Sequence, residues 1–330
     1  MLRLSDFNYD LPGELIAQYP LKERDTARLL LLDRLKGEIR HCIFKDLPKY
    51  LNKDDLIVLN DTKVLRARLK GSRLTSGKVE VLLLGRKEGL TFKALIKPSR
   101  VRIGERVLFN GGSVSGLVSA KNEITFNAKD ADTVYSLGSM PLPPYIKRDP
   151  LDTDDIYYQT VYANEEGAIA SPTAGLHFTK ELLDNIKFSG TDVAYITLHV
   201  GYATFRPVKA DDISQHKMEP EYFKISESAR SLIDKARSGK SRVFAVGTTS
   251  LRALEAYAGG IQEGHTDLFI YPGYKFKIAD CLLTNFHLPR TTLFMLVCAF
   301  AGEELAKKAY QEAIDKKYRF YSYGDAMLII

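Results

Sequence analysis

A series of short, strand-like segments between residues 64 and 126 constrains the fold of this chain more than any other feature of its sequence. Six segments of four to seven residues are rich in apolar residues, and glycines separate them with no helical pattern between them. Regular short strands with turn signals between them are typical of a small closed barrel or sandwich. We therefore expect strands in segments 64–70, 79–84, 91–96, 106–109, 115–118 and 123–126.

Positive charge is concentrated in the same region. Between Arg66 and Asp149 there are sixteen Lys and Arg against seven Asp and Glu, whereas the rest of the chain has a slight negative excess. This asymmetry indicates a polyanionic partner, although a well-solvated surface has the same composition. Aromatic residues for base stacking are sparse, so contact with a nucleic-acid backbone is expected rather than base recognition. The cations that we expect to make this contact are Lys97, Arg100, Arg102 and Arg106.

The rest of the chain alternates strand-like and helix-like segments, which indicates a layered α/β domain with a mixed sheet. The stiff segment Pro141–Tyr145 is expected to return the chain from the barrel. Because 330 residues exceed what one core usually holds, we divide the chain into an α/β domain of residues 1–64 and 150–330 and an inserted barrel of residues 65–149. The α/β strands are expected at 56–59, 193–202, 243–246 and 267–271, and the helices at 180–186, 226–237, 249–257, 292–301 and 303–317.

The segment Gly167–Thr179 has neither helical nor strand periodicity, yet it is too apolar and too poor in charge for a solvated loop. Its hydroxyls offer hydrogen bonds, and its glycines let a ligand approach the backbone closely, as a small-molecule site requires. The alternative is a buried crossing loop whose hydroxyls satisfy its own backbone. The candidate residues from this segment are Ser171, Thr173, His177 and Phe178.

A second polar stretch, Val246–Ser250, lies where an expected strand passes into an expected helix. Free amides at a helix start bind anions or ribose hydroxyls, although any strand-to-helix junction has a similar composition. No lysine follows as in a Walker loop, and the chain contains no G-x-G-x-x-G. The candidate ligand contacts are Gly247, Thr248, Thr249, Ser250 and Arg252 here, with Arg206, Asn285 and His287 from elsewhere.

Neither a metal site nor a disulfide framework is expected. The three cysteines are widely spaced and form no C-x-x-C pair, and the histidines lack the paired spacings of metal ligands. Histidine titrates near neutrality, and desolvation can bring a carboxylate there, so either group can supply a general base. The candidates are His177, Asp61 and Glu219, each of which is equally compatible with a structural hydrogen bond or a cap.

No signal peptide or membrane helix is expected, so we expect a cytoplasmic protein. Asp6 and Asp10 interrupt the first ten residues, and no apolar run follows Arg3. The longest uncharged apolar run, Leu293–Ala301, is far shorter than the roughly 20 residues that a membrane helix needs.

Several longer motifs extend over the whole chain. They include L-N-D-T-K-V, P-L-P-P-Y-I, G-A-I-A-S-P-T-A-G-L-H-F, L-H-V-G-Y-A-T-F-R-P-V, V-G-T-T-S-L-R-A-L-E, T-D-L-F-I-Y-P-G, T-N-F-H-L-P-R-T-T-L and Y-R-F-Y-S-Y-G-D-A-M. With these motifs the chain resembles one known family, the S-adenosylmethionine:tRNA ribosyltransferase-isomerases of queuosine biosynthesis.

The resemblance implies that the ribosyl part of S-adenosylmethionine is moved onto 7-aminomethyl-7-deazaguanine at the tRNA wobble position. Epoxyqueuosine-tRNA, adenine and methionine would result, so S-adenosylmethionine would be a consumed substrate and no recycled cofactor would be needed. It also implies an α/β domain with an inserted barrel, and no metal. A tRNA methyltransferase and a non-catalytic RNA-binding protein are the alternatives, and the oligomeric state cannot be predicted.

Overall fold

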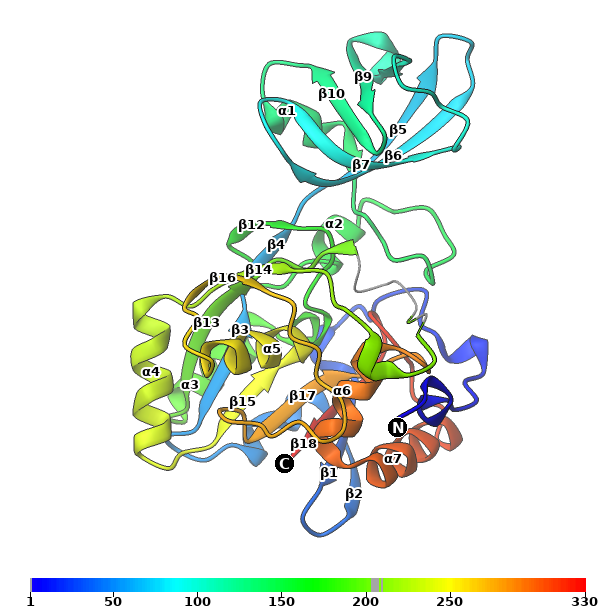
Figure 1. Cartoon of the computed structure of the whole chain (residues 1–330). Helices are drawn as coiled ribbons and strands as arrows, with labels where there is room; N and C mark the ends of the chain where they lie inside the picture. Colours follow the sequence, from blue (N-terminus) through cyan, green and yellow to red (C-terminus); the bar gives the residue numbers. More distant parts are fainter. Residues whose placement is uncertain (1, 203–207, 209) are drawn as a thin grey trace.

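The computed structural model describes residues 2–202, 208 and 210–330 of the chain. It consists of a layered α/β body and a smaller barrel that stands apart from it, joined by two connecting segments (Figure 1). All strands of the barrel lie between Arg68 and Ser139, so the chain leaves the α/β body for the barrel and then returns to it. This arrangement confirms the predicted fold class.

The α/β body is built on a mixed sheet with nine strands in the described residues, in the order β16-β14-β13-β3-β15-β17-β18-β1-β2. The central strands β13, β3, β15 and β17 are parallel, β18 is antiparallel to β17, and β1 is parallel to β18. The strands are β1 (Arg28–Asp33), β2 (Glu38–Ile43), β3 (Leu56–Asn60), β13 (Asp192–Leu198), β14 (Glu221–Lys224), β15 (Val243–Val246), β16 (Glu263–Thr266), β17 (Cys281–Asn285) and β18 (Ala326–Ile329).

Helices cover both faces of this sheet because successive residues of its central strands point to opposite sides. In β3, Leu56 and Val58 pack in the core under α4, α5, α6 and α7, whereas Ile57 and Leu59 pack in the core under α3 and η4. The covering helices are α3 (Lys180–Phe188), α4 (Glu227–Ser238), α5 (Gly247–Tyr257), α6 (Thr292–Ala301), α7 (Glu303–Asp315) and the 3-10 helix η4 (Phe44–Tyr50).

The inserted barrel closes because β8 pairs with β5 at the end of the series β5-β6-β7-β10-β9-β8. Its interior contains the buried rings of Phe92, Phe109 and Phe126, and the Phe126 ring contacts the other two. Five of the six predicted strands are found where they were expected, whereas the first, predicted at 64–70, begins only at Arg68 because residues 65–67 form no strand. The six barrel strands are β5 (Arg68–Arg73), β6 (Lys78–Arg86), β7 (Thr91–Lys97), β8 (Arg106–Phe109), β9 (Val114–Ala120) and β10 (Glu123–Asn127), followed by α1 (Ala131–Ser136) and β11 (Gly138–Ser139).

A short parallel pair, β4 (Thr62–Val64) and β12 (Glu165–Ala168), lies beside the exit to the barrel, and α2 (Asp154–Tyr157) follows the return. The predicted strand at 267–271 is wrong, because the strand in that region, β16, ends at Thr266. Leu268 instead gives its carbonyl to Arg252 Nε and its amide to Thr266 Oγ1, so side chains take the place of a strand partner.

The helices of the described residues include none with the length and apolarity that crossing a membrane requires. The apolar run noted in the sequence forms most of α6, a helix of ten residues that is buried in the core of the α/β body.

Candidate active site

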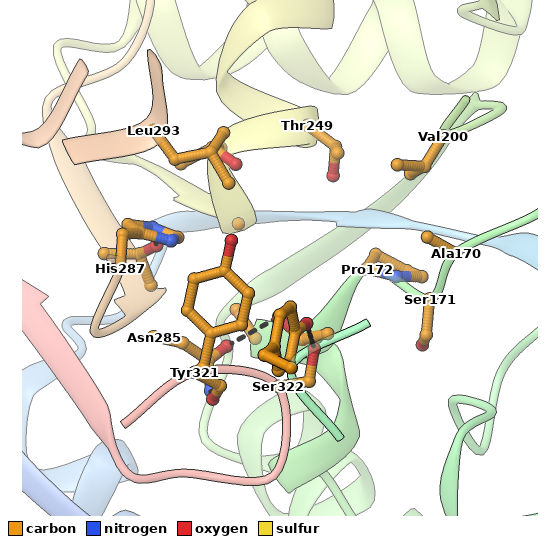
Figure 2. Close-up of a pocket in the computed structure, with 16 residues that line it drawn as sticks. Ala170, Ser171, Pro172, Val200, Thr249, Asn285, His287, Leu293, Tyr321 and Ser322 are labelled. Carbon is orange, nitrogen blue, oxygen red and sulfur yellow. Dashed lines mark hydrogen bonds between the residues drawn. The ribbon is translucent and has the colours of Figure 1, made fainter. Parts of the chain in front are cut away.

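A cleft lies at the edge of the sheet where its parallel strands end (Figure 2). Residues that follow β13 and β15 and the end of β17 line it, and this is the edge at which open α/β sheets bind ligands. The cleft encloses about 520 Å³ of space, its open mouth included. Its lining residues are Tyr145, Ala170, Ser171, Pro172, Thr173, Ala174, Val200, Gly247, Thr248, Thr249, Thr284, Asn285, His287, Leu293, Tyr321 and Ser322.

One wall is the segment Ala170–Ala174, which the sequence marked as a candidate binding loop. The amide of Ile169 donates to Val200 O at 3.1 Å, so the loop is tied to the chain that leaves β13. Gly175 packs against the Tyr162 hydroxyl so closely that no side chain fits there. The loop is therefore held by its neighbours and presents Ser171 and Thr173 to the cleft.

The opposite wall is the junction between β15 and α5. Gly247 has φ +86°, a left-handed conformation that glycine adopts without strain and that turns the strand into the helix. Helix α5 begins without a side-chain cap, and the first amides of a helix have no intrahelical acceptor. The start of α5 thus presents donors and a partial positive charge at the cleft.

Two hydroxyls on these walls have no hydrogen-bond partner in the described part of the chain. Ser171 Oγ and Thr249 Oγ1 are buried from solvent, and their residues are only 5% and 9% exposed. Buried hydroxyls in folded proteins are nearly always hydrogen-bonded, and leaving one unpaired costs about 1–3 kcal/mol. Both residues line the cleft, so a bound ligand is the natural source of the missing partners.

Asn285, at the end of β17, connects the cleft to the residues behind it. Its side-chain oxygen accepts from Thr173 Oγ1 at 3.0 Å, and its Nδ2 donates to His177 Nε2 at 3.2 Å and to Tyr321 O at 3.2 Å. His177 therefore accepts at Nε2 as a neutral imidazole, and burial lowers its pKa to about 4. It does not line the cleft itself, but reaches it through Asn285.

His287 is the imidazole that does line the cleft. Its Nε2 lies 2.9 Å from Thr284 Oγ1, and its backbone amide donates to the Tyr310 hydroxyl at 3.1 Å. Burial lowers the pKa of His287 to about 3, so this ring is also neutral near pH 7. Its neutral nitrogens can accept or donate a hydrogen bond to a bound molecule.

Two tyrosines complete the cleft, and sequence reasoning missed both. The rings of Tyr145 and Tyr321 meet edge to face with centroids 3.8 Å apart, and the Tyr145 hydroxyl bonds Ser322. Tyr321 has φ +72°, which is unusual for an aromatic residue. Tyr145 belongs to the proline-rich return segment. The only sequence signal for its role was an aromatic residue that follows three prolines in a stiff segment.

Three predicted ligand contacts lie outside the cleft, and a fourth cannot be placed. Phe178 is fully buried against Phe44 in the core below α3. Arg252 is buried in an ion pair with Glu221, so its charge is already neutralised. Ser250 is fully buried within α5. Arg206 lies outside the described residues.

The two acidic candidates for the general base also lie away from the cleft lining. Asp61 follows β3 and accepts a hydrogen bond from Thr197 Oγ1 at 2.7 Å, and burial raises its pKa. Glu219 is exposed just before β14. In the described residues, no three side chains of His, Cys, Asp or Glu gather as metal ligands would.

The four barrel cations that the sequence singled out lie at the surface. Lys97, Arg100, Arg102 and Arg106 are exposed, and none forms an ion pair in the part of the chain that the structure describes. Other barrel cations are neutralised, as in the pairs Arg68–Glu80, Arg73–Glu105 and Lys87–Glu123. The four remain available to a polyanion.

Comparison of the sequence with known proteins identifies the family of this chain. The sequence model of a family described as "Queuosine biosynthesis protein" matches residues 4–329. The chain belongs to this family. Two similar members are the S-adenosylmethionine:tRNA ribosyltransferase-isomerases of Caldanaerobacter subterraneus subsp. tengcongensis and of Sulfurihydrogenibium sp., which are 50% and 49% identical, with 100% of each chain covered.

A solved structure of the queuosine biosynthesis family agrees with this membership. The crystal structure of the S-adenosylmethionine tRNA ribosyltransferase of Thermotoga maritima, at 2.00 Å resolution, is 34% identical and has a TM-score of 0.58. The alignment covers 98% of this chain and 100% of the other, so it includes both the α/β body and the barrel. The predicted family is confirmed, and neither alternative function is favoured.

Proposed function

We propose that this protein moves the ribosyl moiety of S-adenosylmethionine onto 7-aminomethyl-7-deazaguanine at the wobble position of tRNA. The products are epoxyqueuosine-tRNA, adenine and methionine. Family membership and the names of close relatives support a transferase of this kind. The observation that carries the assignment to a site is the cleft at the carboxyl edge of the sheet, with its two unpartnered hydroxyls.

S-adenosylmethionine suits this cleft by its chemistry. Ribose hydroxyls and the adenine edge supply partners for Ser171 Oγ and Thr249 Oγ1, and the Tyr145 and Tyr321 rings lie where a sulfonium or adenine can contact them. The described lining contains no Asp, Glu, Lys or Arg. S-adenosylmethionine is consumed in the reaction, so it acts as a substrate and not as a recycled cofactor.

The methionine carboxylate needs a partner in the same cleft. Arg252, one expected partner, already bonds Glu221 and two backbone carbonyls. The uncapped start of α5 offers amides and a positive helix terminus instead. The start of α5 is therefore the proposed binding site of the carboxylate, and Arg206, the other partner predicted from the sequence, lies outside the described residues.

The chemistry begins with a proton transfer. The sulfonium acidifies the adjacent ribose carbon, so a base can remove that proton to form an ylide, and adenine can leave. The amine of the tRNA base can then attack the unsaturated sugar, and methionine leaves as its carbon–sulfur bond to the sugar breaks on epoxide formation. His177 is the proposed base, with Asp61 and Glu219 as alternatives. The geometry adds His287, because its ring lines the cleft whereas His177 reaches it through Asn285.

Product analysis tests this function. Purified protein is incubated with S-adenosylmethionine and tRNA that bears the precursor base, and the products are identified by mass spectrometry. Equal amounts of adenine, methionine and epoxyqueuosine-tRNA are expected. Release of S-adenosylhomocysteine would identify a methyltransferase, and tRNA binding without any turnover would identify an RNA-binding protein.

A further inference from the structure

A second, smaller cavity adjoins the cleft and contains two arginines. Ser322 lines both spaces, and His177, in the wall of the second, bonds Asn285 in the wall of the first. The second cavity encloses about 280 Å³ with its open mouth included, compared with about 520 Å³ for the cleft measured in the same way. It therefore suits one chemical group of a larger substrate. Arg24 and Arg319 line it, and its described lining contains no carboxylate.

Arg24 retains most of its hydrogen-bonding capacity. Its Nη1 donates to Leu176 O at 3.0 Å and its Nη2 to Ile156 O at 2.6 Å, so both recorded partners are uncharged carbonyls. A guanidinium has five N–H donors. No carboxylate bonds Arg24 among the residues that the structure describes, and burial lowers its pKa. A half-buried cation of this kind lacks the counter-ion that such groups normally have.

Arg319 is only partly neutralised. Asp325 accepts from Arg319 Nη2 at 3.4 Å, and it also accepts from Arg28 Nε at 3.3 Å. One carboxylate thus serves two guanidinium groups. Arg24, Arg319 and His177 line the same cavity, so the two guanidinium charges lie near this imidazole. The cavity therefore has an excess of positive charge beside the cleft.

We propose that the Arg24–Arg319 cavity is an oxyanion subsite that binds a phosphate of the tRNA next to the nucleotide being modified. The inference rests on the proposed function. A nucleotide whose base enters the cleft brings its own phosphates to the cleft wall, and Arg binds phosphate through paired N–H donors. The carboxylate of S-adenosylmethionine has the same oxyanion chemistry, so the experiment must distinguish the two sources.

Arg24→Gln removes the charge but keeps an amide that can donate to a carbonyl. Arg34→Gln is the matched control, because Arg34 also donates to two backbone carbonyls, Phe300 O and Asp280 O. Each guanidinium also lies over an aromatic ring, that of Tyr157 for Arg24 and that of Phe300 for Arg34. Binding of a precursor-bearing anticodon stem-loop is measured by fluorescence anisotropy across a salt series, and binding of S-adenosylmethionine by calorimetry.

We expect Arg24→Gln to weaken RNA binding about tenfold and to reduce the slope of log affinity against log salt by about one, the contribution of one phosphate contact. Affinity for S-adenosylmethionine should not change, and Arg34→Gln should leave both affinities as in the wild type. Reduced affinity for S-adenosylmethionine alone would overturn the phosphate assignment and give the subsite to the carboxylate. Affinities equal to those of the control would overturn the subsite.

Chemical changes to the phosphates of the RNA give a test that does not depend on how a protein variant folds. Uncharged methylphosphonates replace the anticodon-loop phosphates one at a time. One substitution should weaken wild-type binding and have no further effect on Arg24→Gln. If none weakens wild-type binding, the proposal fails. Because binding is measured separately from turnover, failure of the product analysis would reject the proposed function and leave this result intact.

Discussion

The two buried imidazoles near the cleft differ in their access to a ligand. His287 lines the cleft, whereas His177 lies behind Asn285. We expect alanine at the residue that acts as the base to lower turnover about a hundredfold or more, with binding of S-adenosylmethionine retained. Single-turnover rates and calorimetry on His177→Ala and His287→Ala measure both quantities. His265→Ala is the control, because His265 is exposed on β16, away from the cleft.

The pH dependence of kcat/KM gives a second test of the two histidines. A base works in its neutral form, and burial lowers the pKa of His177 to about 4 and of His287 to about 3. Both rings stay neutral between pH 8 and pH 6, so kcat/KM should show no ionisation of these groups in that range. Turnover within tenfold of wild type in both variants would exclude both histidines and direct attention to Asp61 and Glu219.

Residue chemistry at strand ends was a good guide to the cleft lining. Ser171, Thr173 and Asn285, which were predicted from the sequence, line the cleft. They could be found because small polar side chains and glycines in otherwise apolar segments indicate a binding site. The prediction that Arg252 contacts the ligand was wrong, because this arginine pairs with Glu221, which lies 31 positions away and in another element. Tyr321 could not be found by such reasoning, because its place depends on a left-handed backbone that only the fold specifies.

The junction between β15 and α5 depends on one backbone conformation. A Cβ at Gly247 would meet its nearest neighbours at 3.5 and 3.7 Å, so space does not forbid a side chain, but φ +86° does. Gly247→Ala should lower the free energy of unfolding by about 1–2 kcal/mol and weaken binding of S-adenosylmethionine, because the start of α5 must shift. Urea unfolding and calorimetry measure these effects.

Gly13→Ala provides the comparison, since Gly13 has open space around it and no positive φ. If Gly247→Ala matched this control in stability and in ligand affinity, the cleft would not depend on the left-handed turn.

Strands with local signals were predictable, and strands that depend on distant partners were less so. The six barrel strands pair largely with neighbours in sequence, and glycine turns mark their ends. The strand predicted at 267–271 is absent, since β16 ends at Thr266 and Arg252 donates to the carbonyl of Leu268. No local pattern predicted that β18 would lie between β17 and β1, since parallel pairing joins segments far apart in the chain.

At the scale of the whole molecule, the barrel stands apart from the α/β body (Figure 1). The exposed cations Lys97, Arg100, Arg102 and Arg106 belong to the barrel, whereas the uncharged cleft lies at the sheet edge of the α/β body. Changing Lys97, Arg100 and Arg102 together to Glu should weaken tRNA binding and flatten its salt dependence. The variant makes fewer phosphate contacts, so its binding releases fewer counterions. Affinity for S-adenosylmethionine should stay the same. Filter binding across a salt series and calorimetry measure the two affinities.

A matched reversal of Arg237, Lys240 and Lys308 controls for net charge. These cations are exposed on the α/β body and form no ion pair among the described residues. Equal losses of tRNA affinity in the two triple variants would show that overall charge matters and that the barrel surface does not.

The position of β18 has a consequence for how the chain is made. The barrel pairs within one continuous stretch of sequence, so it can fold as soon as Ser139 has left the ribosome. Strand β1 must wait for β18, which is translated roughly 190 residues after Ser139, or about 10 to 40 seconds later at ordinary rates of synthesis. During that interval, the apolar strand Leu29–Leu32 has no parallel neighbour, so a nascent chain of this protein carries a finished barrel before its sheet can close.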